Sequence, residues 1–208
     1  MNEYIKFKFK IFNLQNNKNF ALIDNKLINI FKKNRYLTKL IPLQLRDYKK
    51  VKNKIRNSYL KSTINNENMN FVYTLSKLLN ISNKSFVKSM NTFEGLAHRY
   101  ENFLQKKNVT FINDSKATSF ESSKFALASR KNIYWILGGL PKYKDKINLK
   151  NLKKNIVKSY IIGKNTNHFS KQLKGNVIFS NTKNLSNAII RVLKDIKLFN
   201  KSDNTVLL

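Results

Sequence analysis

The second half of the chain is constrained by a repeated alternation of short apolar runs and segments with helical spacing. From Gly95 onward, runs rich in β-branched and aromatic residues predict strands at 109–112, 133–137, 158–162, 177–179 and 205–208. Apolar residues at helical spacing predict helices at 119–130, 149–156, 167–173 and 184–198. Such alternation is typical of right-handed βαβ units. We therefore predict an α/β fold built on a mainly parallel sheet with flanking helices.

The first 94 residues follow a less regular pattern. Residues 1–12 alternate polar and apolar side chains, which predicts an amphipathic strand. Further strands are expected at 20–23 and 36–43, with a helix between them that has Asp24 as its N-cap. Helices are also expected at 45–55, at 65–80 and from Ser82 or Asn83 to Met90. The expected apolar face of the helix at 65–80 consists of Phe71, Val72, Leu75, Leu78 and Leu79.

A short polar loop, Asn113-Asp114-Ser115-Lys116-Ala117-Thr118, separates one predicted strand from the helix that follows it. Open α/β sheets bind ligands at this kind of junction, and the free N–H groups of a helix start favour anions. The loop offers a carboxylate, an ammonium group and two hydroxyls as polar contacts. A strand, an Asx-type turn and a capped helix without any ligand would give the same spacing.

The charge balance is strongly basic, with Lys+Arg 41 against Asp+Glu 11 and a formal net charge of +30. Such a surface is typical of nucleic-acid binders, because releasing phosphate counterions favours binding. The lysines nevertheless run through nearly every segment, and the sequence has no zinc-finger spacing, RNP-type aromatic motif or basic arm. We expect no specific nucleic-acid partner, and a basic nucleic-acid-binding protein remains an alternative function.

Other classes of protein are excluded by what the sequence lacks. No cysteine occurs, and His98 and His168 are far apart, so a disulfide framework or a zinc site is not expected. No apolar run approaches the ~20 residues that cross a bilayer, and the N-terminus lacks a signal-peptide pattern. We therefore expect a cytoplasmic protein without a membrane partner, and a monomer.

Three segments, in this order along the chain, resemble the Mur ligase family. The loop at 113–118 is similar to the Asn-Asp-Ser-Lys-Ala-Thr segment of its D-glutamate-adding members. Upstream, Thr92-Phe93-Glu94-Gly95-Leu96-Ala97-His98-Arg99-Tyr100-Glu101 is similar to a Phe-x-Gly-Leu-x-His-Arg-x-Glu motif. Downstream, Ile136-Leu137-Gly138-Gly139-Leu140-Pro141-Lys142 is similar to a strand that ends in Gly-Gly-x-x-Lys. Other Mur ligases carry a different loop, so the resemblance favours the D-glutamate-adding branch.

The resemblance implies two domains, neither complete. Residues 95–208 correspond to the Rossmann-like C-terminal domain of the ligases, incomplete at its end. Residues 1–94 correspond to the remnant of the central, ATP-binding domain. A phosphate-binding loop is missing, because the only glycines are Gly95, Gly138, Gly139, Gly163 and Gly175. We expect a ligase fragment that is inactive alone; a free-standing Rossmann-like ligand-binding module is a further alternative.

The resemblance also implies a reaction and its contacts. The whole enzyme would use ATP and Mg²⁺, bound mainly by the missing part, to join D-glutamate to UDP-N-acetylmuramoyl-L-alanine through an acyl phosphate. Arg99 and Asp114 match residues at the ATP. Lys116, Thr118 and Lys142 match residues at the D-glutamate. Asn65 matches the first asparagine of a nucleotide-contacting His-Asn-x-x-Asn motif in which Ile64 replaces the histidine.

Each implied contact has a plainer explanation. Asn65 is equally suited to cap the helix that follows it. Arg99 could pair with Glu94 or Glu101 on the surface, a contact worth little. Lys142 could be one solvated lysine among Lys144 and Lys146. We expect His98 to act as a structural hinge residue rather than as a base.

Overall fold

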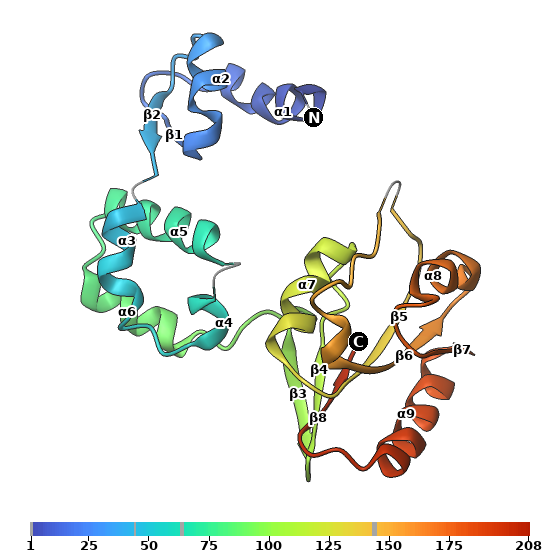
Figure 1. Cartoon of the computed structure of the whole chain (residues 1–208). Coiled ribbons are helices and arrows are strands. Elements are labelled where there is room, and N and C mark those ends of the chain that lie inside the picture. The colour runs from blue at the N-terminus through green and yellow to red at the C-terminus, as the bar shows by residue number, and fades with distance from the viewer. Residues whose placement is uncertain (1, 44, 63–64, 143–144) are drawn as a thin grey trace. The chain divides into compact units, whose positions relative to one another are not determined.

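The computed structural model describes residues 2–43, 45–62, 65–142 and 145–208 (Figure 1). The chain forms two compact units, Met1–Phe93 and Glu94–Leu208. The domain identities implied by the resemblance stay predictions. Within the described residues, no helix is both long and apolar enough to cross a membrane.

The unit Glu94–Leu208 is built on a six-stranded sheet with the order β3-β4-β8-β5-β6-β7. Strand β3 is antiparallel to β4, and each of the other neighbouring pairs is parallel. The predicted α/β fold with a mainly parallel sheet is therefore confirmed. The strands are β3 (Glu101–Lys106), β4 (Val109–Asn113), β5 (Ile133–Gly138), β6 (Ile156–Ile162), β7 (Phe179–Lys183) and β8 (Asn204–Leu207).

Helices cover both faces of this sheet (Figure 1). On one face, α7 (Phe120–Ser129) and α8 (Thr166–Leu173) bury Leu127 and Leu173 against Trp135 and its neighbours. On the other face, α9 (Leu185–Phe199) buries Val192 against alternate residues of the same strands. Because both faces of the sheet are buried, the sequences of the central strands are nearly continuous apolar runs. These runs allowed the strands to be predicted from the sequence.

An ion pair is buried beneath α9. The Lys158 ammonium lies 2.7 Å from Oδ2 of Asp195, and both side chains are 10% exposed. The Tyr160 hydroxyl donates to the same carboxylate oxygen at 2.8 Å. Burial alone would raise the pKa of Asp195, but the hydrogen bonds from Lys158 and Tyr160 and the nearby positive charges lower it overall.

Two buried tyrosines on this face provide a matched pair of substitutions. The Tyr134 hydroxyl is buried without a hydrogen-bond partner in the described part of the chain, whereas the Tyr160 hydroxyl is bonded to Asp195. Tyr134→Phe should leave the free energy of unfolding unchanged or raise it by up to about 1 kcal/mol. Tyr160→Phe should lower it by about 1–2 kcal/mol. Urea unfolding followed by the fluorescence of Trp135 measures both; equal effects would contradict this prediction.

The unit Met1–Phe93 contains mostly helices and one parallel pair of strands. One apolar cluster gathers around Phe9 and Phe31, and another around Tyr48 and Tyr73. The strands are β1 (Phe20–Ile23) and β2 (Lys39–Pro42). The α-helices are α1 (Asn2–Phe9), α2 (Ile28–Lys33), α3 (Leu45–Lys52), α4 (Ser58–Lys61), α5 (Asn66–Leu78) and α6 (Asn83–Thr92). The 3-10 helices of the two units are η1 (Lys10–Leu14), η2 (Asn25–Leu27) and η3 (Lys153–Asn155).

Several local predictions for this unit are confirmed. Strand β1 has the predicted bounds, and β2 lies inside the predicted range. The Asp24 side chain accepts a hydrogen bond from the Lys26 N–H at the start of η2, which α2 follows. Ser82 is the N-cap of α6, because its side chain accepts from the Ser85 N–H.

The predicted strand at residues 1–12 is wrong, since the described part of that segment is α1 followed by the start of η1. The spacing of its apolar residues fits both the period of a strand and that of a helix. Ile5, Phe9 and Phe12 also have helical spacing, and they pack against Phe31 and Tyr36. The aromatic packing available to a helix therefore decides the conformation.

In the other unit, one prediction is wrong, one is displaced, and one strand was missed. The expected helix at 149–156 is only η3, because Ile156 already begins β6 beside β5. The strand expected at 177–179 lies instead at Phe179–Lys183. Strand β3 was not predicted; its residues are mostly exposed, so they carry no apolar alternation.

Candidate functional site

The polar loop at 113–118 joins the carboxyl end of β4 to the start of α7, as predicted. Oδ1 of Asn113 accepts from the Ser115 N–H at 3.2 Å, which is the expected Asx-type turn. The Ala117 N–H donates to the Asp114 carbonyl at 2.7 Å. Ser119 then caps α7 through its side chain. These hydrogen bonds shape the loop, which lies at the edge where open α/β sheets generally bind ligands.

Asp114 is fixed at both its backbone and its carboxylate. Its N–H donates to the Leu208 carbonyl at 2.6 Å, and its Oδ1 accepts from the Tyr100 N–H at 3.0 Å. Burial raises the pKa of the Asp114 carboxyl, while the Tyr100 hydrogen bond and the positive charge of Arg99 oppose the rise. The carboxylate is therefore held in one place for a hydroxyl or cation to meet it.

The raised pKa of Asp114 gives a stability prediction. A carboxyl whose folded-state pKa lies above its unfolded value contributes stability below the unfolded pKa, and this contribution is lost as the pH rises through the folded pKa. Asp114→Asn removes the charge but keeps an acceptor for the Tyr100 N–H. At pH 7 it should raise the free energy of unfolding by up to about 1 kcal/mol, and the gain should vanish near pH 4.

Urea unfolding at pH 4 and pH 7 tests this expectation. Glu94→Gln is the matched control. This substitution also removes one negative charge, but Glu94 is exposed, so no buried charge is affected. If Asp114→Asn were less stable than the unsubstituted protein at pH 7, the prediction that burial of the charged carboxylate costs free energy would be wrong.

His98 ties the upstream motif to the loop. It has a positive φ of 64°, its N–H donates to Glu101 at 2.8 Å, and its carbonyl accepts from the Lys116 N–H at 3.0 Å. Its Nδ1 lies 2.8 Å from Nδ2 of Asn113, whose amide can donate to it. These contacts support the expected structural role of His98.

A pocket of about 390 Å³ opens at the carboxyl ends of β4, β5 and β8. Asp114, Thr118 and Lys142 all line it, so three of the predicted site residues meet in one place. Lys142 is exposed, as the plainer explanation expects, yet it lies at the pocket wall. Lys144, named in that explanation, lies outside the described residues.

Two glycines shape the wall between β5 and Lys142. A Cβ on Gly138 would lie 2.2 Å from the Ile162 carbonyl oxygen, so only glycine allows β5 and β6 to approach here. Gly139 follows with a φ of +97°, and its carbonyl accepts from Nδ2 of Asn165 at 2.9 Å. The Gly-Gly motif therefore turns the chain at the pocket edge.

The other predicted residues are placed differently. Lys116 and Arg99 are exposed and do not line this pocket. Arg99 forms no ion pair with Glu94 or Glu101 in the described part of the chain, so that explanation is not supported. Asn65 belongs to the other unit, and its Nδ2 donates to the Tyr59 carbonyl at 2.7 Å and to Ser62. Its side chain does not cap α5, and Ile64 lies outside the described residues.

Asp145, His168 and Gln172 also line the pocket and were not predicted as site residues. Oδ2 of Asp145 accepts from the Phe120 N–H at 2.9 Å and so occupies the start of α7. Oε1 of Gln172 accepts from the Ile147 N–H at 2.7 Å, and Nε2 of Gln172 lies 2.7 Å from Nε2 of His168. The only signal in the sequence was the spacing of His168 and Gln172 by one helical turn.

No metal-binding cluster of three or more acidic or histidine side chains occurs among the described residues. This pocket therefore offers Mg²⁺ at most the Asp114 and Asp145 carboxylates. That Mg²⁺ would be held mainly by other parts of a whole ligase stays a prediction.

No family model matches the chain. Curated relatives do match it. It is 30% identical to a UDP-N-acetylmuramoylalanine–D-glutamate ligase of Rickettsia prowazekii, covering 94% of this chain and 48% of that protein. It is 36% identical to the ligase of the same name from the Wolbachia of Brugia malayi, covering 70% of this chain and 29% of that protein. A third, from Rhizobium meliloti, is 38% identical over 55% of this chain and 25% of its own length.

Among solved structures, a murein peptide ligase from Psychrobacter arcticus is 14% identical, with a TM-score of 0.38 over 70% of this chain and 34% of that chain. The fold assignment does not rest on this likeness but on the strand order of the sheet. The chain spans about half, or less, of the length of the curated relatives it matches. The chain is thus a homologue of part of the UDP-N-acetylmuramoylalanine–D-glutamate ligases.

Proposed function

We propose that the chain is part of an ATP-dependent ligase that adds D-glutamate to UDP-N-acetylmuramoyl-L-alanine. The observation that carries the proposal is the pocket at the carboxyl edge of the sheet, where Asp114, Thr118 and Lys142 meet. Relatives at 30–38% identity carry the name of this ligase. A monomer working in the cytoplasm is part of the same proposal.

The chemistry of the site suits an acidic amino acid. Ammonium and hydroxyl groups of Lys142 and Thr118 can bind a carboxylate of D-glutamate, and a charged donor makes such a hydrogen bond stronger. Lys116 lies two residues before Thr118 on the same loop and adds a second cation. Holding the amino acid in this way would present its amine to the activated carboxyl of the other substrate.

The nucleotide side of the proposal involves Asp114 and Arg99. ATP, as a substrate, supplies the phosphoryl group that activates the carboxylate of UDP-N-acetylmuramoyl-L-alanine as an acyl phosphate. The fixed carboxylate of Asp114 suits a ribose hydroxyl, and the exposed guanidinium of Arg99 suits phosphate oxygens. Asn65 is a further proposed nucleotide contact in the other unit; its present hydrogen bonds would then have to change.

A chimera tests the proposal directly. The chain would be joined to the part of the Rickettsia prowazekii ligase that it does not match. We expect phosphate release that requires ATP, UDP-N-acetylmuramoyl-L-alanine and D-glutamate together, and none from the 208-residue chain alone. A folded chimera without D-glutamate-dependent phosphate release would overturn the proposal.

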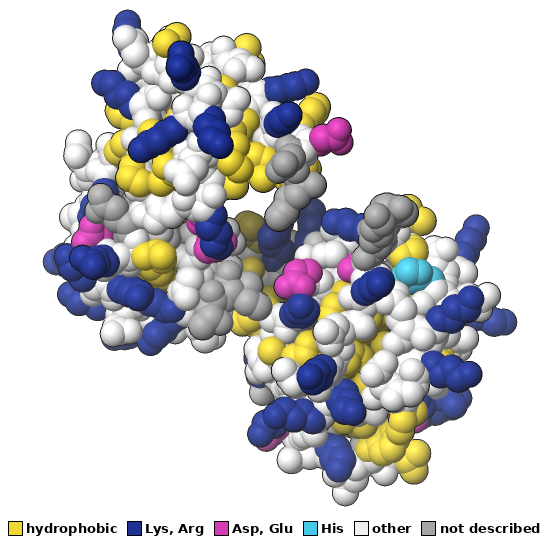
Figure 2. Space-filling model, turned by 45° about the horizontal axis from the view of Figure 1, so that its top comes forward, with side chains coloured by type: hydrophobic (Ala, Val, Ile, Leu, Met, Phe, Trp, Pro, Cys, Tyr) yellow, Lys and Arg dark blue, Asp and Glu magenta, His cyan; other side chains and the backbone are white. Residues whose placement is uncertain are grey.

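The alternative of nucleic-acid binding makes a different prediction. Lys and Arg side chains are scattered over both units on the face shown in Figure 2, and they are interleaved with other residues. Dispersed charge of this kind gives non-specific binding that falls steeply with salt. We expect retention on heparin at low salt that is lost by about 0.3 M NaCl, without preference for any RNA. Selective, salt-resistant binding of one RNA would favour the alternative.

A further inference from the structure

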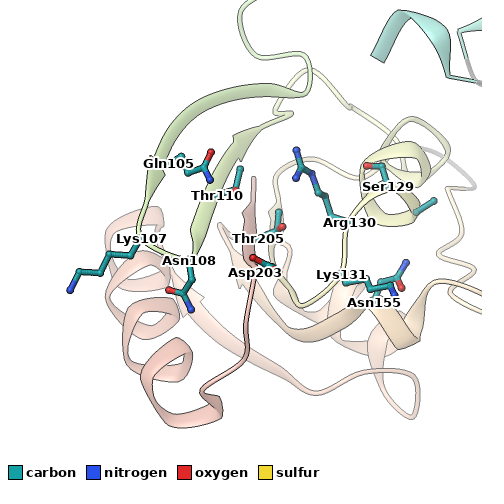
Figure 3. A pocket seen from close by; sticks show the side chains of 11 residues that line it. Gln105, Lys107, Asn108, Thr110, Ser129, Arg130, Lys131, Asn155, Asp203 and Thr205 are labelled. Carbon is teal, nitrogen blue, oxygen red and sulfur yellow. The ribbon is translucent and has the colours of Figure 1, made fainter. Parts of the chain in front are cut away.

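A second pocket lies at the opposite edge of the same sheet, where β4 and β8 begin and α7 ends (Figure 3). Its volume is about 470 Å³, and none of the predicted site residues lines it. Arg130 rises from the end of α7, and Thr205 lies in the floor at the start of β8. The pocket therefore belongs to a different part of the fold from the proposed ligase site.

Arg130 is positioned by a chain of hydrogen bonds. Its Nε–H donates to the Tyr100 hydroxyl at 3.1 Å, and that hydroxyl lies 2.6 Å from Oγ of Ser129. Ser129 in turn donates to the Ala126 carbonyl at 3.1 Å. In this order each hydroxyl donates once, and the two terminal amino groups of the Arg130 guanidinium are left for another partner. Within the described part of the chain, no carboxylate forms an ion pair with Arg130.

The plainer role for Arg130 is to cap the end of α7, where a cation is favoured. Two carbonyls of the last turn are already satisfied by other side chains. Oγ of Ser129 donates to Ala126, and Nδ2 of Asn155 donates to Leu127 at 2.9 Å. The Arg130 side chain makes its hydrogen bond to Tyr100 and none to a carbonyl of α7 in the described part of the chain, so capping does not account for the guanidinium.

The floor of the pocket holds an unused hydroxyl. Thr205 is 2% exposed and lines the pocket, yet its hydroxyl has no hydrogen bond to the described residues. Gln105 and Thr110 stand on one side of the hollow and Arg130 and Ser129 on the other, while Lys107 points away (Figure 3).

Hydrogen bonds connect the segments around the pocket. The Thr205 N–H donates to the Asn132 carbonyl at 3.1 Å, and Nδ2 of Asn132 donates to Ser202 at 2.6 Å. Nδ2 of Asn108 donates to Lys201 at 3.1 Å on the other side. Such bonds lower the conformational entropy that ligand binding would cost.

We propose that this pocket binds a small oxyanion, the carboxylate or phosphate group of a metabolite. The terminal amino groups of Arg130 would grip two of its oxygens, and the Thr205 and Thr110 hydroxyls would donate to the same group. Asp203 is the one carboxylate in the described lining, which also includes the cations Arg130, Lys131 and Lys107. A ligand that also carries a hydroxyl or an amine can use it.

Side-chain NMR of the whole chain tests the proposal. Inorganic phosphate and acetate would be titrated separately, at constant ionic strength, while the Arg130 Nε–H and the Gln105 side-chain amide are observed. At least one of the two anions should shift both signals saturably. Arg130→Gln and Thr205→Val should each weaken binding, seen at the Gln105 amide, by at least about tenfold and about threefold respectively.

The controls separate this pocket from other sites. Arg46→Gln removes an exposed arginine of the other unit and should leave the affinity unchanged. Lys142→Gln should also leave it unchanged, because Lys142 lines the pocket at the carboxyl edge and not this one. The proposal is overturned if neither anion gives a saturable shift, or if Lys142→Gln abolishes the shift while Arg130→Gln and Thr205→Val do not.

Discussion

In the chimera that restores the length of a whole ligase, Lys116→Ala should raise the KM for D-glutamate at least about tenfold and leave the KM for ATP within about twofold. A hydrogen bond from a charged group contributes about 1.5–3 kcal/mol, and each 1.4 kcal/mol is a tenfold change in affinity. Lys116 is exposed. Its backbone N–H donates to the His98 carbonyl, and this bond does not involve the Lys116 side chain. The substitution should therefore remove the ammonium group without disturbing the loop. Steady-state kinetics with each substrate varied in turn measure both constants.

Two further variants make the Lys116 result specific. Lys146→Ala is the control for charge, because Lys146 is exposed like Lys116 but lies outside the loop at 113–118. Arg99→Ala should show the reverse pattern, with a weakened dependence on ATP and little change for D-glutamate. Unchanged D-glutamate kinetics in Lys116→Ala would remove this lysine from the amino-acid site and leave Thr118 and Lys142, which line the pocket, as the contacts to test.

Local signals explain why the loop at 113–118 was predicted well. A strand, an Asx-type turn and a capped helix each depend on residues a few positions apart, and these local contacts set the backbone of the loop. The bonds that tie the loop to His98, Tyr100 and Leu208 are long-range, and the sequence did not predict them. Asp145 lies 25 positions from Phe120, the residue whose N–H it accepts. Only the folded chain brings these two together, so no spacing in the sequence could have predicted the contact.

Helix α5 has apolar residues on two sides, and their spacing in the sequence did not predict which side is buried. The sequence favours the face with Val72, Leu75 and Leu79, yet these residues are 44%, 48% and 64% exposed. The core is formed instead by Met69 and Tyr73. Tyr73 packs edge-on against Phe86, with ring centroids 5.1 Å apart. Aromatic packing between helices decides which face is buried, and it depends on partners that the pattern of one helix does not contain.

The buried pair beneath α9 should be the most sensitive point of the unit Glu94–Leu208. Asp195→Asn should lower the free energy of unfolding at pH 7 by about 3–5 kcal/mol, because it leaves the Lys158 ammonium buried without a counter-charge. The side chains of both residues are 10% exposed, so water cannot replace the lost partner. Trp135 is the only tryptophan and lies in β5, so its fluorescence during urea unfolding reports on this unit.

The pH dependence of that loss follows from the sign of the pKa shift. The folded-state pKa of Asp195 is lowered, so its contribution is complete above the unfolded pKa of about 3.9 and is lost as the pH falls through the folded value. The difference between the natural protein and Asp195→Asn should therefore shrink below about pH 4. A loss of the same size at pH 3 and pH 7 would show that the charge of Asp195 is not its cause.

The double variant Lys158→Met/Asp195→Leu separates two quantities. One is the loss of stability when a single partner is removed, and the other is the net contribution of the intact pair to the free energy of unfolding. Removing both charges leaves no buried ion and fills similar volumes with apolar atoms. Such replacements are often neutral or stabilising, so the double variant should lose much less than the sum of Lys158→Met and Asp195→Leu measured separately. Additive losses would mean that the two side chains act independently, in spite of their 2.7 Å contact.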